Sequence, residues 1–382
     1  MSAPRIFIIA GEASGDALGA ALMRALRAAR PNVVFNGVGG EAMTREGLSS
    51  LFPLTDIAVM GLLPVLARLP TLIARIKETT RAILASSPDC LVIIDSPDFT
   101  HRVARKVRRM RPDLPIVDYV SPTVWAWRPG RARKMRAYVD CVLALLPFEP
   151  QAHAQLGGPR CVYVGHPLVE RLDELTPAPG EGQGALLVLP GSRLAEIERM
   201  TPLYGETLAL LLKDHPGLDV AVPVAPHMEE PLRKALRDWP LEPRLIPQSE
   251  KYAAFRQARA ALVTSGVATL ELALACTPMA VAYKVSRLES WLRFLVRVHS
   301  IVLPNLVIGA NAVPEFVQEA ATPRALADAI EPLLAAGAAR DAQLAAFARV
   351  RARMIEAGRN PSARAANIVL DYVDNGARRP AS

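Results

Sequence analysis

Short apolar runs alternate with longer amphipathic stretches along most of the chain. In the first half, runs of β-branched and other apolar residues predict strands at residues 6–10, 33–35, 91–95, 116–120, 142–146 and 162–164. Between the first two runs, leucines recur every four residues over residues 16–29, which predicts a helix. Strands that alternate with helices in this way are typical of a parallel sheet covered by helices on both faces.

A second series of the same kind follows. It opens with the apolar run 186–189, and further strands are predicted at residues 220–224, 245–246, 261–263 and 279–282. Thr201 followed by Pro202 predicts that a helix restarts there, with threonine as its cap and proline as its first residue. The C-terminal part predicts three helices, which begin near residues 322, 339 and 361.

The length of 382 residues favours about two domains. We therefore predict an α/β fold of two doubly wound, Rossmann-like domains that face a cleft. The expected divisions are an N-terminal domain (1–171), a Pro- and Gly-rich linker (172–184), a C-terminal domain (185–358), a helix (359–375) and a disordered tail (376–382).

The last helix has an apolar stripe that needs a partner surface. Ala365, Ile368, Val369 and Tyr372 recur at spacings of three and four residues. We expect this helix to cross back to an N-terminal domain. That domain belongs either to the same chain or to a second subunit, and the second arrangement would make a homodimer.

Composition narrows the class of protein. The mean hydropathy is +0.19, yet no apolar run approaches the roughly 18 residues of a membrane span. We also expect no secretory signal, because the first strand runs straight into a glycine turn. The four cysteines are scattered and the six histidines lack metal-ligand spacing, which predicts buried free thiols and no metal site.

Positive charge is concentrated in one block. Residues 101–136 hold eleven Lys and Arg residues against Asp113 and Asp118, within a chain of formal net charge +8. Such a block indicates an anionic partner or a solvated face. Nucleic acid, an anionic membrane surface and a phosphorylated substrate all fit.

Two turns between a strand and a helix predict anion sites. At Gly191-Ser192-Arg193, backbone N–H groups, the helix dipole and a planar guanidinium point to a phosphate, and Ser192 is the expected cap. No Glu or Gln stands three residues after Ser192 to complete a capping box. At Ser265-Gly266 a second turn precedes Glu271, whose carboxylate is placed to bind a ribose diol. The alternatives are ordinary turns and an exposed helical glutamate.

Two turns in the first half also carry polar residues. The segment 11–19 places glycines and Ser14 before a helix, but its glycines do not have the dinucleotide-binding spacing, so we expect neither NAD nor FAD. Asp95 and Asp98 follow a strand and fit a general base with a supporting partner, or simple caps of the turn and helix. The chain has no Asp-x-Asp motif for a metal-bridged diphosphate.

Aromatic and apolar residues accompany the arginines in three places. The segment 121–128 holds two of the four tryptophans and suits either nucleic acid or a loop packed in a cleft. The segments 60–76 and 287–297 combine apolar residues with arginine. Core helices explain both segments, and so do helices that lie in a membrane interface.

Taken in order, these motifs resemble the lipid-A-disaccharide synthase family from about residue 5 to about residue 370. The matching segments are 11–16 (GEASGD), 94–99 (IDSPDF), 119–128 (YVSPTVWAWR), 146–149 (LPFE), 165–166 (GH), 189–193 (LPGSR), 265–271 (SGVATLE) and 303–306 (LPNL). The tryptophan motif is highly specific, whereas Gly-Ser-Arg alone is weak.

The resemblance implies an inverting glycosyltransferase of the two-Rossmann, GT-B type. We expect it to need no metal or other cofactor, because the chain has neither an Asp-x-Asp motif nor a His/Cys cluster. It joins UDP-2,3-diacylglucosamine to 2,3-diacylglucosamine 1-phosphate, which gives a β-1,6-linked disaccharide and UDP. The implied nucleotide-binding residues are Gly191, Ser192, Arg193, Ser265, Gly266, Glu271 and Asn305. The implied acceptor-binding residues are Ser14, Gly15, Asp16, Ser121, Trp127 and Arg128. Asp98 is the first candidate for the general base, Asp95 the second and His166 the third.

Three other functions stay open at this stage. A UDP-sugar epimerase is the nearest rival, a Rossmann oxidoreductase is disfavoured by the glycine spacing, and a basic module that binds nucleic acid is the alternative without enzymatic activity. The synthase interpretation expects no nucleic-acid partner. It expects a cytoplasmic protein, a possible homodimer, attached peripherally to the inner face of the inner membrane.

Overall fold

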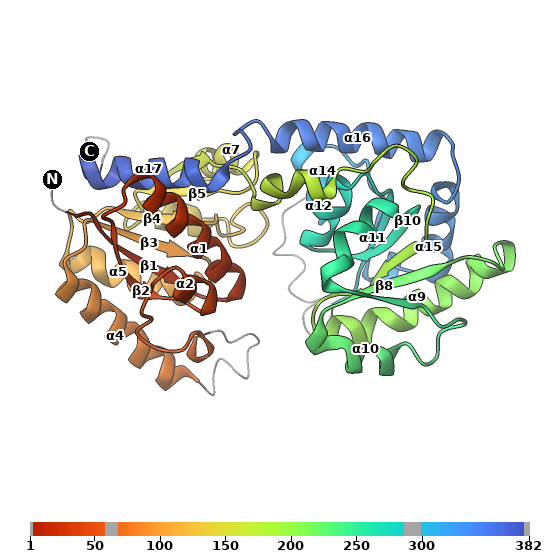
Figure 1. Cartoon of the computed structure of the whole chain (residues 1–382), viewed down its shortest axis with the longest axis horizontal. Coiled ribbons are helices and arrows are strands. Elements are labelled where there is room, and N and C mark those ends of the chain that lie inside the picture. The colour runs from red at the N-terminus through yellow and green to blue at the C-terminus, as the bar shows by residue number, and fades with distance from the viewer. Residues whose placement is uncertain (1–2, 58–67, 286–298, 378–382) are drawn as a thin grey trace. The chain divides into compact units, whose positions relative to one another are not determined.

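Two six-stranded parallel sheets organise the chain, one in each of two units (Figure 1). Unit 1 comprises Met1–Val169 and Ala357–Ser382, and unit 2 comprises Glu170–Glu356. The computed structural model describes residues 3–57, 68–285 and 299–377. The α/β class and the paired sheets agree with the prediction from the alternating pattern.

The sheet of unit 1 has the strand order β2-β1-β3-β4-β5-β6. Its strands are β1 (Arg5–Ala10), β2 (Val34–Val38), β3 (Cys90–Ile94), β4 (Ile116–Tyr119), β5 (Cys141–Ala144) and β6 (Arg160–Tyr163). Its helices are α1 (Ala13–Ala29), α2 (Glu41–Arg45), α4 (Leu69–Ser86), α5 (Thr100–Met110), α6 (Gly130–Met135), α7 (Glu149–Gln155) and α17 (Pro361–Asn375). Along β1, Ile6 and Ile8 enter the core on one face, and Phe7 and Ile9 enter the core on the other. Continuous apolar runs were therefore the right signal for strands covered on both faces.

The sheet of unit 2 has the order β12-β11-β10-β7-β8-β9. Its strands are β7 (Leu186–Leu189), β8 (Val220–Val224), β9 (Arg244–Pro247), β10 (Ala260–Thr264), β11 (Met279–Tyr283) and β12 (Glu315–Val317). Its helices are α8 (Leu172–Leu175), α9 (Leu194–Asp214), α10 (Glu229–Ala235), α11 (Lys251–Gln257), α12 (Val267–Leu274), α14 (Leu303–Ile308), α15 (Pro323–Ile330) and α16 (Ala338–Met354). The edge strand β12 was not predicted from the sequence. It has only three residues, and none of them is buried, so it shows no apolar run.

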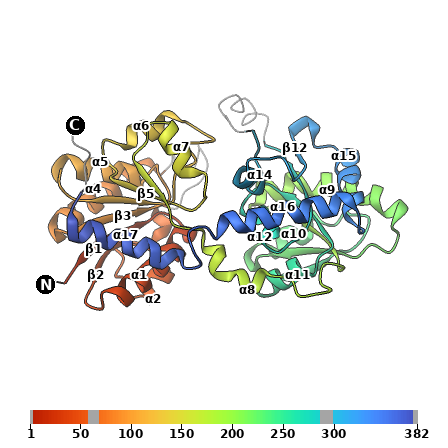
Figure 2. The ribbon, with the colours of Figure 1, turned by 90° about the horizontal axis from the view of Figure 1, so that it is seen from above.

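The C-terminal helix α17 returns to unit 1 and packs along α1 (Figures 1 and 2). Ala365, Val369 and Tyr372 are buried in the core on that face of the sheet. Arg30, just after α1, also pairs with Asp374 at 2.6 Å. The apolar stripe thus finds its partner surface within the same chain.

One local expectation was wrong. Helix α9 continues through Thr201 and Pro202 without a restart, and the Thr201 hydroxyl donates to the carbonyl of Ile197 at 2.8 Å. Burial of the surrounding helix face, including Met200 and Tyr204, offsets the single backbone bond that proline removes.

The segment 172–184, predicted as a linker, belongs to unit 2 and is held there by contacts within that unit. Leu172 and Leu175 of α8 are buried, and the carbonyl of Gly182 accepts a hydrogen bond from the Arg340 guanidinium at 3.0 Å.

No helix in the described ranges is both long and apolar enough to cross a bilayer. The segment 287–297 and residues 60–67 of the other apolar segment lie outside the described residues. The rest of the apolar segment 60–76 includes the start of α4, where Leu69 and Ile73 are exposed.

Candidate functional site

A pocket of about 480 Å³ lies within unit 2 at the carboxyl ends of β7 and β10. In open parallel sheets this edge is where ligands bind. The turn after β7 contributes Gly191, Ser192 and Arg193 to the pocket wall. The turn after β10 and helix α12 contribute Ser265, Gly266 and Glu271. Six of the seven residues predicted to bind the nucleotide therefore lie around one cavity.

The N-terminus of α9 is capped by the carboxylate of Glu196, a residue of the same helix. Glu196 Oε2 accepts hydrogen bonds from the N–H groups of Ser192 (3.0 Å) and Arg193 (3.4 Å), and its Oε1 lies 3.0 Å from Arg193 Nη1. The helix cap is Arg193, one residue later than the predicted Ser192, so that Glu196 stands at the third position of a capping box. These N–H groups already have an acceptor, but the Arg193 guanidinium is 59% exposed and can reach a ligand.

The start of α12 is open in comparison. Gly266, Val267 and Ala268 line the same pocket, and no side chain of the described residues caps this helix. The neighbouring Ser265 hydroxyl is turned to the carbonyl of Ile301, to which it donates at 2.7 Å. An uncapped helix N-terminus attracts an anion through its N–H groups and dipole. The start of α12 and the Arg193 side chain thus give one pocket two positively polarised groups that suit an anion.

Glu271 forms a buried ion pair at the wall of the pocket. Lys251 Nζ lies 2.7 Å from its carboxylate, and the Tyr252 hydroxyl donates to Oε1 at 3.1 Å. Glu271 is only 7% exposed, so the alternative of an exposed helical glutamate was wrong. Lys251 was not predicted as a site residue, although its position shortly after β9 places it at the same edge of the sheet.

Asn305 does not line this pocket. Its side chain is fully buried and donates to the carbonyl of Val313 at 2.9 Å. Its Oδ1 accepts from the N–H groups of Ala312 (3.0 Å) and Val313 (2.9 Å). Asn305 thus holds the loop after α14 in place and offers no free acceptor to a nucleotide.

In unit 1, the turns after β1 and β3 meet at the same sheet edge. Ser14 Oγ lies 3.5 Å from Asp95 Oδ2, and Asp95 Oδ1 accepts from the N–H of Ser96 at 2.8 Å. Asp95 and Ser96 both have positive φ values, of 56° and 43°. A Cβ on Gly11 would lie 2.0 Å from Ser96 Cβ, so glycine is required where the two turns touch.

Asp98 is the freely accessible carboxylate of this edge. Its side chain is 82% exposed, and Arg131 Nη2 lies 3.5 Å from Oδ1. Asp95, in contrast, is half-buried and bound to its own turn. The geometry favours Asp98 over Asp95 as the group that an incoming hydroxyl can reach.

The third candidate base is His166, whose ring nitrogen Nδ1 already accepts a hydrogen bond. Its Nδ1 accepts a hydrogen bond from the N–H of Leu168 at 3.2 Å, which assigns the ring proton to Nε2. Burial lowers the pKa of His166 to about 4. The neutral ring therefore has no free lone pair with which to take a proton.

Asp16 has a structural role in this unit. Its carboxylate accepts hydrogen bonds from the N–H groups of Gly40 (2.7 Å), Ala42 (2.8 Å) and Met43 (3.1 Å), at the start of α2. Gly15 is also buried, and a Cβ there would lie 3.5 Å from Ile94. Of the three acceptor residues predicted in this turn, only Ser14 is exposed.

The tryptophan motif is anchored by α7. The Ser121 hydroxyl lies 2.9 Å from His153 Nε2, and Trp125 Nε1 donates to Glu149 Oε1 at 3.1 Å. Burial raises the pKa of Glu149 to about 7. The sequence analysis gave no role to Glu149 or His153, whose effect depends on contacts far along the chain.

Trp127 and Arg128 stand at the other end of that motif. Arg128 lies over the Trp127 ring, 5.2 Å from its centroid, and adopts a positive φ of 54°. Ser121 is buried, whereas Trp127 is half-buried and Arg128 is exposed. The exposed end of the motif is therefore the part that is open to a ligand.

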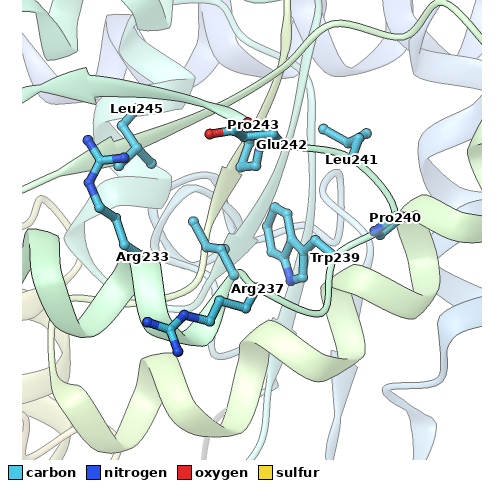
Figure 3. A pocket seen from close by; sticks show the side chains of 9 residues that line it. Arg233, Arg237, Trp239, Pro240, Leu241, Glu242, Pro243 and Leu245 are labelled. Carbon is cyan, nitrogen blue, oxygen red and sulfur yellow. The ribbon is translucent and has the colours of Figure 1, made fainter.

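A second pocket of unit 2, of about 420 Å³, lies away from both turns (Figure 3). Trp239 forms part of its wall, with its indole N–H bonded to the carbonyl of Thr201 at 2.9 Å. Arg233 in the same wall already pairs with Glu229. None of the predicted site residues lines this pocket.

The comparison with known families decides between the candidate functions. Residues 6–369 match the sequence model of a family described as lipid-A-disaccharide synthetase. The chain belongs to this family. Relatives named lipid-A-disaccharide synthase include one from Nitrobacter hamburgensis, 53% identical over 97% of this chain and 96% of its own length. Another, from Rhodopseudomonas palustris, is 50% identical with the same coverage.

Solved structures with low sequence identity support the fold of this family member. A calicheamicin glycosyltransferase aligns with a TM-score of 0.61 at 16% identity and covers 98% of this chain and 99% of its own. The UDP-GlcNAc 2-epimerase from Neisseria meningitidis, bound to UDP-GlcNAc, aligns with a TM-score of 0.59 at 11% identity. This alignment covers 97% of this chain and 99% of the epimerase chain. At these identities the likeness is one of fold, and it is shared by transferases and epimerases.

The residues that could hold a metal ion are sparse. Among the described residues, no three His, Cys, Asp or Glu side chains lie close enough together to form a metal site.

Proposed function

We propose that the chain transfers 2,3-diacylglucosamine from UDP to 2,3-diacylglucosamine 1-phosphate and forms the β-1,6-linked disaccharide of lipid A. The observation that carries this proposal is the pocket of unit 2. A capped turn with Arg193, the open start of α12 and the Glu271 carboxylate surround one cavity in a member of the synthase family.

We assign the donor nucleotide to unit 2. The diphosphate would accept hydrogen bonds from the first N–H groups of α12 and from Arg193. The Glu271 carboxylate, oriented by Lys251 and Tyr252, would accept hydrogen bonds from the two ribose hydroxyls. Asn305 is left out of this assignment because its amide is fully used within the protein.

We assign the acceptor to unit 1, where Asp98 is the proposed general base. The carboxylate takes the proton from the 6-hydroxyl of the acceptor as its oxygen attacks the anomeric carbon of the donor. The bond from that carbon to the phosphate oxygen breaks, and UDP leaves with the electron pair. One in-line displacement of this kind inverts the anomeric centre.

The leaving diphosphate gains negative charge as this bond breaks. Arg193 and the α12 N-terminus are placed to stabilise that charge, since fixed donors in a pocket cost no reorganisation during the reaction. This account gives arginine and backbone N–H groups the part that a metal ion plays in other transferases. The acceptor residues proposed alongside Asp98 are Ser14, Trp127 and Arg128.

We further infer a peripheral location at the cytoplasmic face of the inner membrane. Both substrates carry acyl chains, and Leu69, Ile73 and Met110 are exposed on α4 and α5 of unit 1, whose helix α5 is rich in arginine. Apolar side chains beside basic ones suit an anionic lipid surface. Flotation with anionic vesicles should show binding at low salt that weakens at high salt, and no binding at low salt would contradict this location.

The function is tested by separating transfer from epimerisation. UDP-2,3-diacylglucosamine is incubated with the enzyme, with and without the monosaccharide phosphate, and UDP and disaccharide are measured by mass spectrometry. We expect UDP release to depend on the acceptor. UDP-N-acetylglucosamine is incubated in parallel and examined by NMR, because an epimer has the same mass. Its conversion to an epimer, with no disaccharide formed in the first assay, would instead favour an epimerase.

A further inference from the structure

An arginine-lined pocket in unit 1 surrounds Asp98. It has a volume of about 350 Å³ and lies at the carboxyl ends of β3 and β4. The residues that line it are Pro97, Asp98, His101, Arg102, Arg105, Arg128 and Arg131. Four guanidinium groups therefore share one cavity with a single carboxylate.

Asp98 is the one acidic residue among the described residues that line this pocket, against four arginines. The only ion pair across the pocket, among the described residues, joins Arg131 to Asp98 at the long distance of 3.5 Å. Arg102 makes no ion pair or side-chain hydrogen bond with any described residue, and Arg128 contacts the face of Trp127. Because guanidinium groups stay charged at any working pH, this arrangement favours an anion in the cavity.

A buried chain of polar groups holds Arg105 in position. Arg105 Nη2 donates to the Tyr138 hydroxyl at 3.1 Å and lies over the same ring, 4.7 Å from its centroid. That hydroxyl lies 3.0 Å from His101 Nδ1, and His101 Nε2 lies 3.1 Å from Asp118 Oδ2. The His101 and Asp118 side chains are 4% and 1% exposed. Arg105 is thus oriented from the core before any ligand arrives, which lowers the entropy cost of binding.

The pocket also lies at the start of α5. His101 and Arg102 stand in the first turn of this eleven-residue helix, which no side chain within residues 3–57, 68–285 and 299–377 caps. The helix dipole therefore adds to the field of the arginines. Planar guanidinium groups bind two oxygens of a phosphate at once, and a phosphate monoester offers three terminal oxygens.

We propose that this arginine pocket binds the 1-phosphate of the acceptor sugar, with Arg102, Arg105, Arg128 and Arg131 as its ligands. The inference rests on the proposed function, which supplies a phosphate monoester as part of the acceptor. Asp98 and the phosphate site share one cavity, so binding of the phosphate positions the acceptor next to its base. Arg102 and Arg105 are new site residues, and Tyr138 is a positioning residue for Arg105.

Arg102→Gln tests the pocket, with Arg109→Gln as a matched control. Both arginines are exposed on α5, but Arg109 does not line the cavity. Each protein is assayed with 2,3-diacylglucosamine 1-phosphate and with 2,3-diacylglucosamine that lacks the phosphate. Loss of one charge-assisted contact should lower the preference for the phosphorylated acceptor roughly tenfold or more in kcat/KM. The Arg109→Gln enzyme should keep the preference of the wild type.

An unchanged preference in Arg102→Gln would overturn the proposal. A phospholipid headgroup is the rival ligand, and vesicles of phosphatidylglycerol distinguish it: selective loss of vesicle binding by Arg102→Gln, with the acceptor preference intact, would assign the pocket to the membrane.

Failure of the proposed function has a different signature, because the wild type would then transfer sugar to neither acceptor. In that case calorimetry with glucosamine 1-phosphate still tests the pocket. Binding by the wild type that weakens in Arg102→Gln supports it, and equal or absent binding contradicts it.

Discussion

Lys251 Nζ lies 2.7 Å from the carboxylate of Glu271, and both side chains line the pocket of unit 2. The pair joins the start of α11 to the first turns of α12, and Tyr252 adds a hydrogen bond to the same carboxylate. A carboxylate held in this way presents its remaining acceptor positions in a fixed direction. We infer that this pair orients the ribose of the nucleotide.

The Glu271→Gln variant tests this inference. The amide keeps the size of the side chain but loses its charge and one acceptor oxygen, and it leaves Lys251 without an ionic partner. We expect the Kd for UDP to rise at least tenfold, because a hydrogen bond to a charged group contributes about 1.5–3 kcal/mol. Glu250→Gln is the control, since Glu250 is exposed and immediately precedes α11. Equal UDP affinity of wild type and Glu271→Gln in calorimetry would contradict the assignment.

Arg193 is expected to stabilise the transition state as well as the bound nucleotide. Arg193→Ala should weaken UDP binding by about 1.5–3 kcal/mol and should lower kcat in addition, because charge on the diphosphate grows during the reaction. Arg237→Ala serves as the control, since Arg237 lies in the second pocket of the same unit (Figure 3). If Arg193→Ala binds UDP and turns over like the wild type, this arginine has no such role.

Excess EDTA should leave the activity unchanged. The account assigns charge stabilisation to Arg193 and the α12 N-terminus, and the described part of the chain offers no cluster of three metal-ligating side chains. The measurement is the rate of UDP release before and after incubation with the chelator. Loss of activity that magnesium or manganese restores would replace this electrostatic account with a metal-assisted one.

Glu149 is expected to make stability depend on pH. Burial raises its pKa from an ordinary value of 4.5 to about 7, so the folded protein binds this proton more tightly than the unfolded chain does. The contribution of Glu149 to stability is therefore fully present below pH 4.5 and is lost as pH rises through 7. Relative to Glu149→Gln, the wild type should lose roughly 3 kcal/mol of unfolding free energy across this range. Urea titrations at pH 4.5, 6 and 7.5 measure the difference, and a difference independent of pH would exclude this role.

Much of the fold could be predicted because its signal is local. Runs such as 90–94 are apolar on both faces, and each helix between them repeats its apolar residues at helical spacing. The three half-exposed residues of β12 carry no such pattern. Pro202 predicted the start of a new helix, but α9 continues through it because the surrounding helix face packs in the core.

The candidate site was predicted only where residue type alone carries the chemistry. Arg193 and Glu271 follow predicted strands in the sequence, which was enough to predict that both lie at one edge of the sheet, and both line one pocket. Asn305 resembled a site residue, but its hydrogen bonds to Ala312 and Val313 occupy the amide. Contacts between distant segments, such as Lys251 with Glu271 or Tyr138 with Arg105, require the folded chain.

The stereochemistry of the product tests the central claim most directly. Wild-type enzyme is incubated with α-linked UDP-2,3-diacylglucosamine and 2,3-diacylglucosamine 1-phosphate, and the product is examined by NMR. The account predicts a disaccharide joined through the 6-oxygen of the acceptor, whose new anomeric proton shows the large diaxial coupling of a β linkage. An α-linked disaccharide, or no disaccharide at all, would contradict an inverting transfer that Asp98 assists as the base.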